Sequence, residues 1–167
     1  MHSASDFRST MLRLSLLLII AFVGVLAFVS AEIVNFQMCD DSVDTCTIQQ
    51  VMVTPCPEAE FNAACLVRRR HRFTMSFTFT PHFDADQLDA SLGWAKSETV
   101  ELPLLTMDRE ACKYTSCPVR SGVTHNYTNN MPVDSKSPLS PYTIRWALKD
   151  PVSQKRCCFT IDIKVVR

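Results

Sequence analysis

The stretch Phe73-Thr74-Met75-Ser76-Phe77-Thr78-Phe79-Thr80 alternates strictly between apolar and hydroxyl-bearing side chains. Successive side chains of a β-strand point to opposite faces, so this period of two predicts a strand with one buried face. The same alternation recurs, more weakly in the last three segments, at residues 100–104, 142–149, 159–165, 46–53, 91–96 and 123–128. No segment between them shows a convincing helical period with a cap. The chain is therefore expected to be all-β, with about seven short strands.

The strands are separated by turns rich in Pro, Asp and Asn, a pattern that favours an immunoglobulin-like antiparallel β-sandwich. Pro103 cannot donate a hydrogen bond to a neighbouring strand, so its strand is expected at a sheet edge. Immunoglobulin domains join their sheets through a disulfide between two mid-strand cysteines. No long-range cysteine pair of this chain brackets a plausible central strand pair. The two sheets are therefore expected to be unpinned at the middle, which would leave a hydrophobic cavity between them.

The first 31 residues have the pattern of a secretory signal peptide. Arg8 and Arg13 precede an apolar run from Leu14 to Val29, which is shorter than the ~20 residues of a membrane-spanning helix. The run ends at Val29-Ser30-Ala31, with small residues where signal peptidase cleaves. We therefore expect a signal peptide at 1–31 and a mature domain at 32–167, with a retained signal-anchor as the alternative.

Cysteine content and composition limit the function. All eight cysteines lie beyond the signal, and an even number in a small secreted domain predicts a disulfide framework. Zinc is disfavoured because there is no Cys-x-x-Cys pair, and eight cysteines allow too many pairings for spacing alone to select one. A formal net charge of zero offers no basic excess for nucleic acid. With no Gly-x-Ser-x-Gly motif and no base beside a nucleophile, we expect neither an enzyme nor a metal or cofactor.

Several short motifs follow one another in a specific order and spacing, each of them weak alone. They are Val53-Thr54-Pro55-Cys56-Pro57, the strand 73–80, Cys117-Pro118-Val119, Tyr127, Met131-Pro132-Val133, Trp146-Ala147-Leu148, and Cys158 followed by Phe159-Thr160-Ile161. Together they resemble the ML (lipid-recognition) domain, most closely the Niemann–Pick type C-two (epididymal secretory protein) family of secreted sterol carriers. The resemblance covers residues 35–167 and implies a hydrophobic ligand held non-covalently between two sheets.

The resemblance also implies three disulfides, Cys39–Cys158, Cys56–Cys65 and Cys112–Cys117. Cys46 and Cys157 depart from the six-cysteine pattern of the family. Cys46 shares a strand face with Ile48, and Cys157 shares one with Phe159. Both are therefore expected to point inward from neighbouring strands, and we predict a fourth disulfide, Cys46–Cys157.

A set of ligand-contacting residues follows from the same resemblance. The mouth of the cavity would consist of Leu102, Pro132 and Val133. An aromatic gate residue of the sterol binders is Leu102 here, and a mouth tyrosine aligns with Ser137, so fatty acids or other small apolar molecules would suit this mouth as well as sterols. The residues by themselves are also consistent with an alternative, in which these side chains pack against one another as a filled core and leave no cavity. The walls would be formed by Val67, Phe73, Met75, Phe77, Trp94, Val100, Ile144, Trp146, Phe159 and Ile161.

The predicted function is a secreted lipid-binding and transfer protein, monomeric, for a sterol, a fatty acid or another small apolar lipid. It would contact membranes or a carrier receptor transiently, in extracellular fluid or the lysosomal lumen. The alternative is an innate-immune recognition protein that presents a microbial lipid to a receptor and needs a basic rim. The basic run at 68–72 is the candidate for that rim, but it also fits a solvated loop or a proprotease site. Asn126-Tyr127-Thr128 is an N-glycosylation sequon, and Asn126 is expected to face solvent.

Overall fold

The structure is a computed structural model that describes residues 32–95, 101–103 and 107–167, with the backbone alone at 101–103. The predicted signal peptide at 1–31 and Val100 lie outside the described residues. Nine strands form there, together with three short 3-10 helices: β1 (Gln37–Met38), η1 (Asp40–Ser42), β2 (Cys46–Thr54), η2 (Pro57–Phe61), β3 (Cys65–Arg68), β4 (Arg72–Pro81), β5 (Asp89–Ala95), β6 (Glu101–Pro103), η3 (Ala111–Lys113), β7 (His125–Pro132), β8 (Pro141–Lys149) and β9 (Arg156–Val166). In the described part of the chain, no helix has the length and hydropathy to cross a bilayer.

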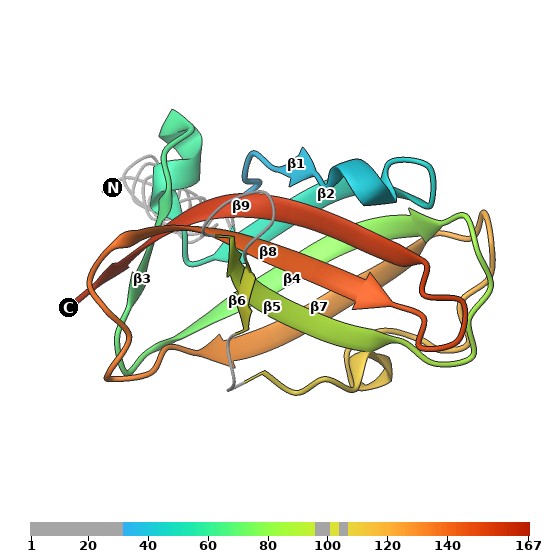
Figure 1. Cartoon of the computed structure of the whole chain (residues 1–167). Coiled ribbons are helices and arrows are strands. Elements are labelled where there is room, and N and C mark those ends of the chain that lie inside the picture. The colour runs from blue at the N-terminus through green and yellow to red at the C-terminus, as the bar shows by residue number, and fades with distance from the viewer. Residues whose placement is uncertain (1–31, 96–100, 104–106) are drawn as a thin grey trace, which may run out of the picture. The chain divides into compact units, whose positions relative to one another are not determined.

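The strands form two sheets that pack face to face as a sandwich, confirming the predicted all-β class (Figure 1). The large sheet has the order β1-β9-β8-β5-β6, with β3 also pairing with β9, and the small sheet has the order β2-β4-β7. Pro103 lies in β6, at the edge of the large sheet as predicted. Two short strands, β1 and β3, were not predicted from the alternation pattern. β3 also pairs parallel to β9, with Leu66 opposite Lys164, so the sandwich is not antiparallel throughout.

Alternation along the strands sorts the side chains as the sequence predicts. On β4, Phe73, Met75, Phe77 and Phe79 are all buried. The hydroxyl side chains between them form a ladder with β7 on the outer face of the small sheet. In this ladder Thr78 donates to Asn126 Oδ1 at 2.9 Å, and the Ser76 and Thr128 hydroxyls are 3.1 Å apart. The polar groups of this face are thus satisfied by one another while the apolar face packs inward.

Four disulfides join the chain, and they are the four predicted pairs: Cys39–Cys158, Cys46–Cys157, Cys56–Cys65 and Cys112–Cys117. The expectation that Cys46 and Cys157 lie on neighbouring strands is wrong. Cys46 begins β2 of the small sheet and Cys157 lies near the start of β9 of the large one, so their bridge crosses the interior. The sheets are also joined by Cys56–Cys65, from just beyond β2 to the start of β3, so the disulfides pin them at the two ends of β2 and not at the middle. Alternation identifies the buried face of a strand but not the sheet to which the strand belongs.

Candidate functional site

Aromatic side chains from both sheets meet at the centre of the sandwich. Phe77 of the small sheet stacks on Tyr127 with ring centroids 4.8 Å apart. It meets Phe159 of the large sheet edge-on at 5.0 Å and Trp146 at 6.2 Å. Offset and edge-on pairs of this kind stabilise beyond the burial of their area. The two inner faces therefore touch at this level, and a guest molecule must part these rings to lie there.

Disulfides join the two sheets on the side of β2. At one end of the sandwich, Cys46 of β2 forms the bridge to Cys157 of β9. At the other end, Cys56, just beyond β2, is bridged to Cys65, which begins β3 of the large sheet.

The opposite edge of the small sheet, β7, carries no such bridge. β7 finishes at Pro132, opposite Arg72 of β4. Neither β7 nor the loop after it contains a cysteine. The sheets can therefore separate more easily where Pro132 and Val133 lie.

The basic run at 68–72 forms the turn between β3 and β4, directly beside Val133. The backbone N–H of Arg70 donates to Val133 O at 2.9 Å, and Val133 N–H donates to His71 O at 2.9 Å. Arg69 Nε donates to Ser137 O at 2.6 Å, which attaches the following loop to the same turn. The sequence could not give the distance from this run to the predicted mouth. In the structure, the main chain of the basic run is hydrogen-bonded directly to Val133 of the predicted mouth.

The predicted wall residues lie on the inner faces of the two sheets, in the described part of the chain. Trp94 is partly exposed, and its ring meets that of Tyr142 edge-on at 5.1 Å. Of the predicted mouth, Pro132 is exposed, Val133 is buried, and for Leu102 the structure describes only the backbone, opposite Trp94. The buried wall residues are Val67, Phe73, Met75, Phe77, Ile144, Trp146, Phe159 and Ile161.

Sequence reasoning missed several inward-facing residues that share this interior. Leu92 and Met131 are buried beside the predicted wall residues of their strands. Tyr142 donates its hydroxyl to Pro138 O at 3.0 Å, between the sheet and the loop that follows Val133. Asn129 is buried on the inner face of β7, although its residue type favours a turn. The alternation of β7 with buried Tyr127 and Met131 is the signal that could have found Asn129.

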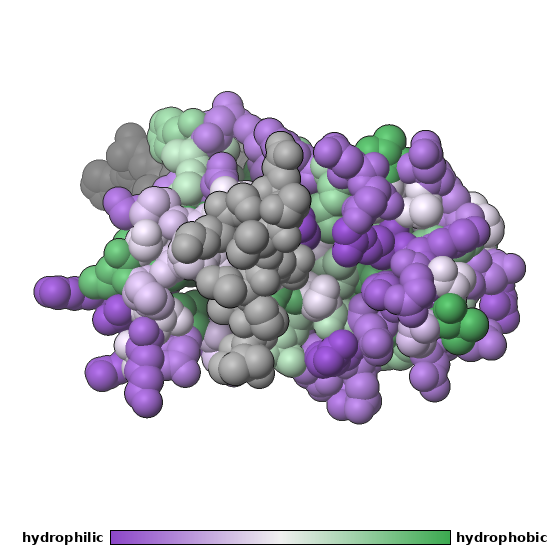
Figure 2. All heavy atoms as spheres, in the orientation of Figure 1, coloured by the Kyte–Doolittle hydropathy of each residue, from purple (hydrophilic) through white to green (hydrophobic). Residues whose placement is uncertain are grey.

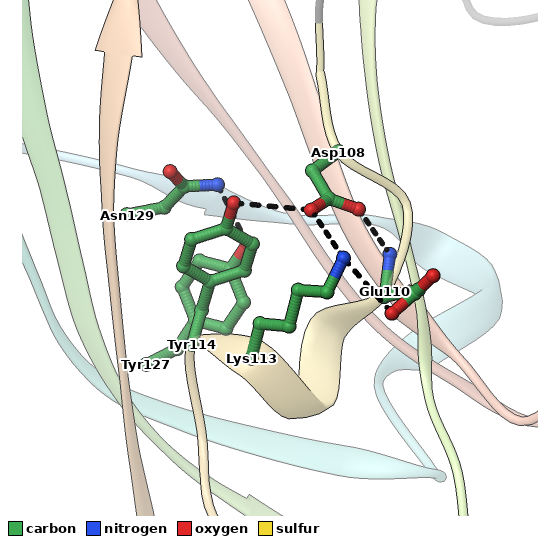
Figure 3. A network of polar contacts seen from close by, with 6 residues as sticks. All are labelled: Asp108, Glu110, Lys113, Tyr114, Tyr127 and Asn129. Atoms are coloured by element: carbon green, nitrogen blue, oxygen red, sulfur yellow. Dashed lines mark hydrogen bonds and ion pairs between the residues drawn. The ribbon is translucent and has the colours of Figure 1, made fainter.

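A polar network borders the aromatic centre on the side of η3 (Figure 3). Asn129 Nδ2 donates to Tyr127 Oη at 3.2 Å, and the neighbouring Tyr114 hydroxyl donates to Asp108 at 3.4 Å. Lys113 forms ion pairs with Glu110 at 2.9 Å and with Asp108 at 3.0 Å. The ring centroids of Tyr114 and Tyr127 are 5.8 Å apart. In the view of Figure 3 the two rings overlap.

Three ionisable groups of this network, Asp108, Lys113 and Tyr127, have shifted pKa values. The Glu110 backbone N–H, and next the Lys113 ammonium, hold the pKa of Asp108 below its usual value. The carboxylates of Glu110 and Asp108 raise the pKa of Lys113. Burial raises the pKa of the Tyr127 phenol, against the smaller effect of its hydrogen bond with Asn129. Tyr127 is therefore a neutral hydroxyl at physiological pH.

Two hollows in the described structure lie on the outer face of the large sheet and not between the sheets. They have volumes of about 420 Å³ and about 330 Å³, and they share Gln37, Thr143 and Thr160. Of the predicted wall residues, Ile161 alone borders either of them. Figure 2 shows hydrophilic side chains over much of the visible face. These polar hollows differ chemically from the apolar interior that the sequence predicts as the site.

Comparison with known sequences decides the family. The sequence pattern of the ML domain matches residues 33–165, which is most of the chain. The chain belongs to the ML-domain family.

Two curated relatives cover most of this ML-domain chain. It is 30% identical to NPC intracellular cholesterol transporter 2 of Bos taurus over 146 residues, which are 86% of this chain and 93% of the relative. It is 28% identical to the MD-2-related lipid-recognition protein of Manduca sexta over 132 residues, which are 78% of this chain and 83% of the relative. Among solved structures it resembles a Niemann-Pick type C2 protein from Japanese carpenter ant, with a TM-score of 0.69 and 20% identity, over 79% of this chain and 99% of that one. At this identity the structural likeness shows the fold alone.

Proposed function

We propose that this ML-domain protein binds a small apolar lipid between its two sheets and transfers it without covalent chemistry. The observation that carries the proposal is the construction of the interior. Aromatic and aliphatic side chains of both sheets face each other, and the two disulfides that join the sheets, Cys46–Cys157 and Cys56–Cys65, lie on the side of β2 and leave the β7 side free of such bridges. Burial of apolar ligand surface contributes about 25 cal/mol per Å², so a sterol-sized ligand needs few polar contacts. The relatives named above support the proposal, because one is named a cholesterol transporter and the other a lipid-recognition protein.

The ligand would pass between the sheets at the end of Pro132 and Val133. Neither β7 nor the loop after it contains a cysteine, and that loop is attached to the Arg69–Arg70 turn by hydrogen bonds. Hydrogen bonds at an exposed loop open at lower cost than a core separates. The ligand would be a sterol or a similar small apolar molecule. Leu102 and Ser137, at positions where sterol binders carry aromatic residues, fit a fatty acid in the same place.

The protein would act in an oxidising compartment, the extracellular fluid or the lysosomal lumen. Four disulfides in one small domain support this placement. The sequence pattern of 1–31 supports secretion with cleavage to a mature domain at 32–167. Asn126 would carry an N-linked glycan, because it is exposed on the outer face of the small sheet, away from the apolar interior. We propose that the protein works as a monomer, with transient contact to a membrane or a carrier receptor.

A second candidate function is recognition of a phosphorylated or microbial lipid, which the protein would present to a receptor. The observation that favours it is the basic turn beside Val133. Arg68, Arg70, His71 and Arg72 are exposed there, and none of the ion pairs in the described residues involves them. Such a turn fits a phosphate at the mouth of the site, and it fits an anionic membrane during transfer equally well.

The decisive experiment is native mass spectrometry of the secreted protein, followed by organic extraction of any bound molecule. A bound sterol or fatty acid is the expected result, and the ligand-free protein is expected to take up a fluorescent sterol. Replacing Val133 with Phe should block that uptake, because Phe fills the proposed mouth. Val123→Phe is the matched control, since Val123 is half exposed and precedes β7 at the opposite end. Protein that takes up neither a sterol nor a fatty acid would refute lipid binding. Equal uptake by both variants would place the mouth elsewhere.

A further inference from the structure

Trp146 carries a buried hydrogen-bond donor that has no acceptor in the described part of the chain. Its side chain is 1% exposed and lies on the inner face of β8. Its Nε1 has no hydrogen-bond partner among the described residues. The indole N–H can only donate, and buried donors in folded proteins are almost always paired. An unpaired donor at this position therefore needs a physical reason.

The surroundings of Trp146 within the described residues are aromatic rings. Its ring meets that of Tyr127 at 5.6 Å between centroids and 72°, and that of Phe77 at 6.2 Å and 71°. The face of an aromatic ring is a weaker acceptor for N–H than an oxygen atom. An oxygen that reached this N–H would therefore form the stronger bond.

Two further polar side chains face the same interior from the opposite sheet. Asn129 is 4% exposed, and Tyr127 is fully buried. They are hydrogen-bonded to each other in Figure 3, through Asn129 Nδ2 and Tyr127 Oη. A side-chain amide has a second N–H and a carbonyl oxygen, so this one bond leaves Asn129 further capacity. The small sheet thus places an amide and a hydroxyl near the level where the large sheet places an indole N–H.

If the core were permanently filled by its own side chains, the polar groups of Trp146, Asn129 and Tyr127 would add nothing to its stability. An apolar side chain of similar volume would pack there without the cost of removing a polar group from water. A hydrocarbon ligand would likewise leave the Trp146 donor unpaired. A ligand with an oxygen at this depth would pair it, once it had parted the contact between Phe77 and the large sheet.

We infer that the ligand carries a hydroxyl or carbonyl oxygen at the end that lies deepest between the sheets, and that Trp146 Nε1–H donates to it. The inference rests on the proposed function, because it needs a lipid between the sheets. Tyr127 and Asn129 provide further hydrogen-bonding capacity beside the same oxygen. The ligand class is therefore a lipid with two polar groups. One lies at the mouth, the other is the oxygen deep between the sheets, and the part of the ligand between them is apolar.

The test compares lipids that differ by one oxygen, each bound to protein made ligand-free by organic extraction. Hexadecanoic acid is paired with 16-hydroxyhexadecanoic acid, and cholesterol is paired with 25-hydroxycholesterol. Trp146→Phe removes the N–H and keeps an aromatic ring, and Phe83→Leu is the control at a buried aromatic residue outside the predicted walls. In at least one pair, we expect Trp146→Phe to weaken binding of the hydroxylated lipid about tenfold relative to its plain partner. Phe83→Leu should leave the ratio of the two affinities as in the unchanged protein.

A spectroscopic readout keeps the inference testable if Trp146→Phe does not fold. Trp94→Phe leaves one tryptophan, so a single indole N–H signal reports on Trp146 in ¹⁵N–¹H spectra. That proton should move downfield when the hydroxylated lipid binds, and much less with the plain lipid. If both lipids bind and the proton responds equally to each, the inference is wrong while the proposed function stands. If no lipid of either pair binds, the proposed function fails and the inference fails with it.

Discussion

Removing the Cys46–Cys157 disulfide should destabilise the protein less than its span along the chain suggests. Its cysteines are 111 residues apart, and those of Cys39–Cys158 are 119 apart. Because both bridges join nearly the same two points of the chain, either one already closes the long loop. The second bridge then closes only a small ring through residues 39–46 and 157–158.

The magnitude follows from the entropy of loop closure in the unfolded chain. A ring of about ten residues corresponds to about 2.7 kcal/mol, whereas a loop of more than a hundred residues corresponds to about 5 kcal/mol. Cys46→Ala with Cys157→Ala should therefore lower the free energy of unfolding by about 2.7 kcal/mol, and so should Cys39→Ala with Cys158→Ala. Replacing all four should cost about 7.5 kcal/mol, roughly 2 kcal/mol more than the two separate effects add up to. The four cysteines are all buried, so the packing lost with the sulfur atoms is similar in the two pairs.

Guanidinium unfolding of the ligand-free proteins, followed by tryptophan fluorescence, measures these free energies. Ligand must be removed beforehand, because a bound lipid would add its own stabilisation. A loss of about 5 kcal/mol from either pair alone would refute the shared-loop reasoning, because each bridge would then act as if the other were absent. The two single-pair variants decide this even if the variant without all four cysteines does not fold.

Three further predictions concern single side chains. The Ser153 hydroxyl, and next the backbone N–H groups of Ser153 and Val152, lower the pKa of Asp150. Its stabilising effect is therefore complete above the unfolded value of 3.8 and is lost as the pH falls through the lower folded value. Asp150→Asn should cost about 1 kcal/mol at pH 7 and much less near pH 2 in thermal unfolding; a loss independent of pH would contradict this. Asn126→Gln should lower the mass of the secreted protein by one N-glycan, and an unchanged mass would show that the sequon is unused. Arg70→Glu should weaken binding to phosphatidylserine vesicles about tenfold at low salt. Lys155→Glu, an exposed change of equal charge in the turn between β8 and β9, should not, and equal losses in a flotation assay would indicate a general charge effect.

Much of the fold can be predicted from local pattern, because the residue types along a strand indicate which of its side chains are buried. The alternation in 73–80 determines which side chains of β4 are buried, and Pro103 identifies an edge strand. The strands β1 and β3 could not be found in this way. β3 has four residues, Cys65-Leu66-Val67-Arg68, which is too short for a period of two to stand out. Its parallel pairing with β9 depends on a partner about a hundred residues away along the chain.

The candidate site shows the same division. The resemblance to the ML domain supplied the wall residues, and alternation explains why they point inward. The neighbours of those residues were not available from the sequence. Nothing local indicated that the basic run would be hydrogen-bonded to Val133, or that Asn129 would be buried against Tyr127.

The sequence by itself determined the class of the fold, the inward face of each long strand, and the family. Three cysteine pairs followed from the family resemblance, and the fourth was the pair that remained. These follow from period, spacing and residue type, which a chain carries before it folds. The tertiary structure alone decided that Cys46 and Cys157 join opposite sheets, that the basic turn borders Val133, and that the Trp146 N–H meets no acceptor among the residues that the structure describes. These depend on which strands become neighbours, and that choice minimises the free energy of the whole chain rather than of any one segment.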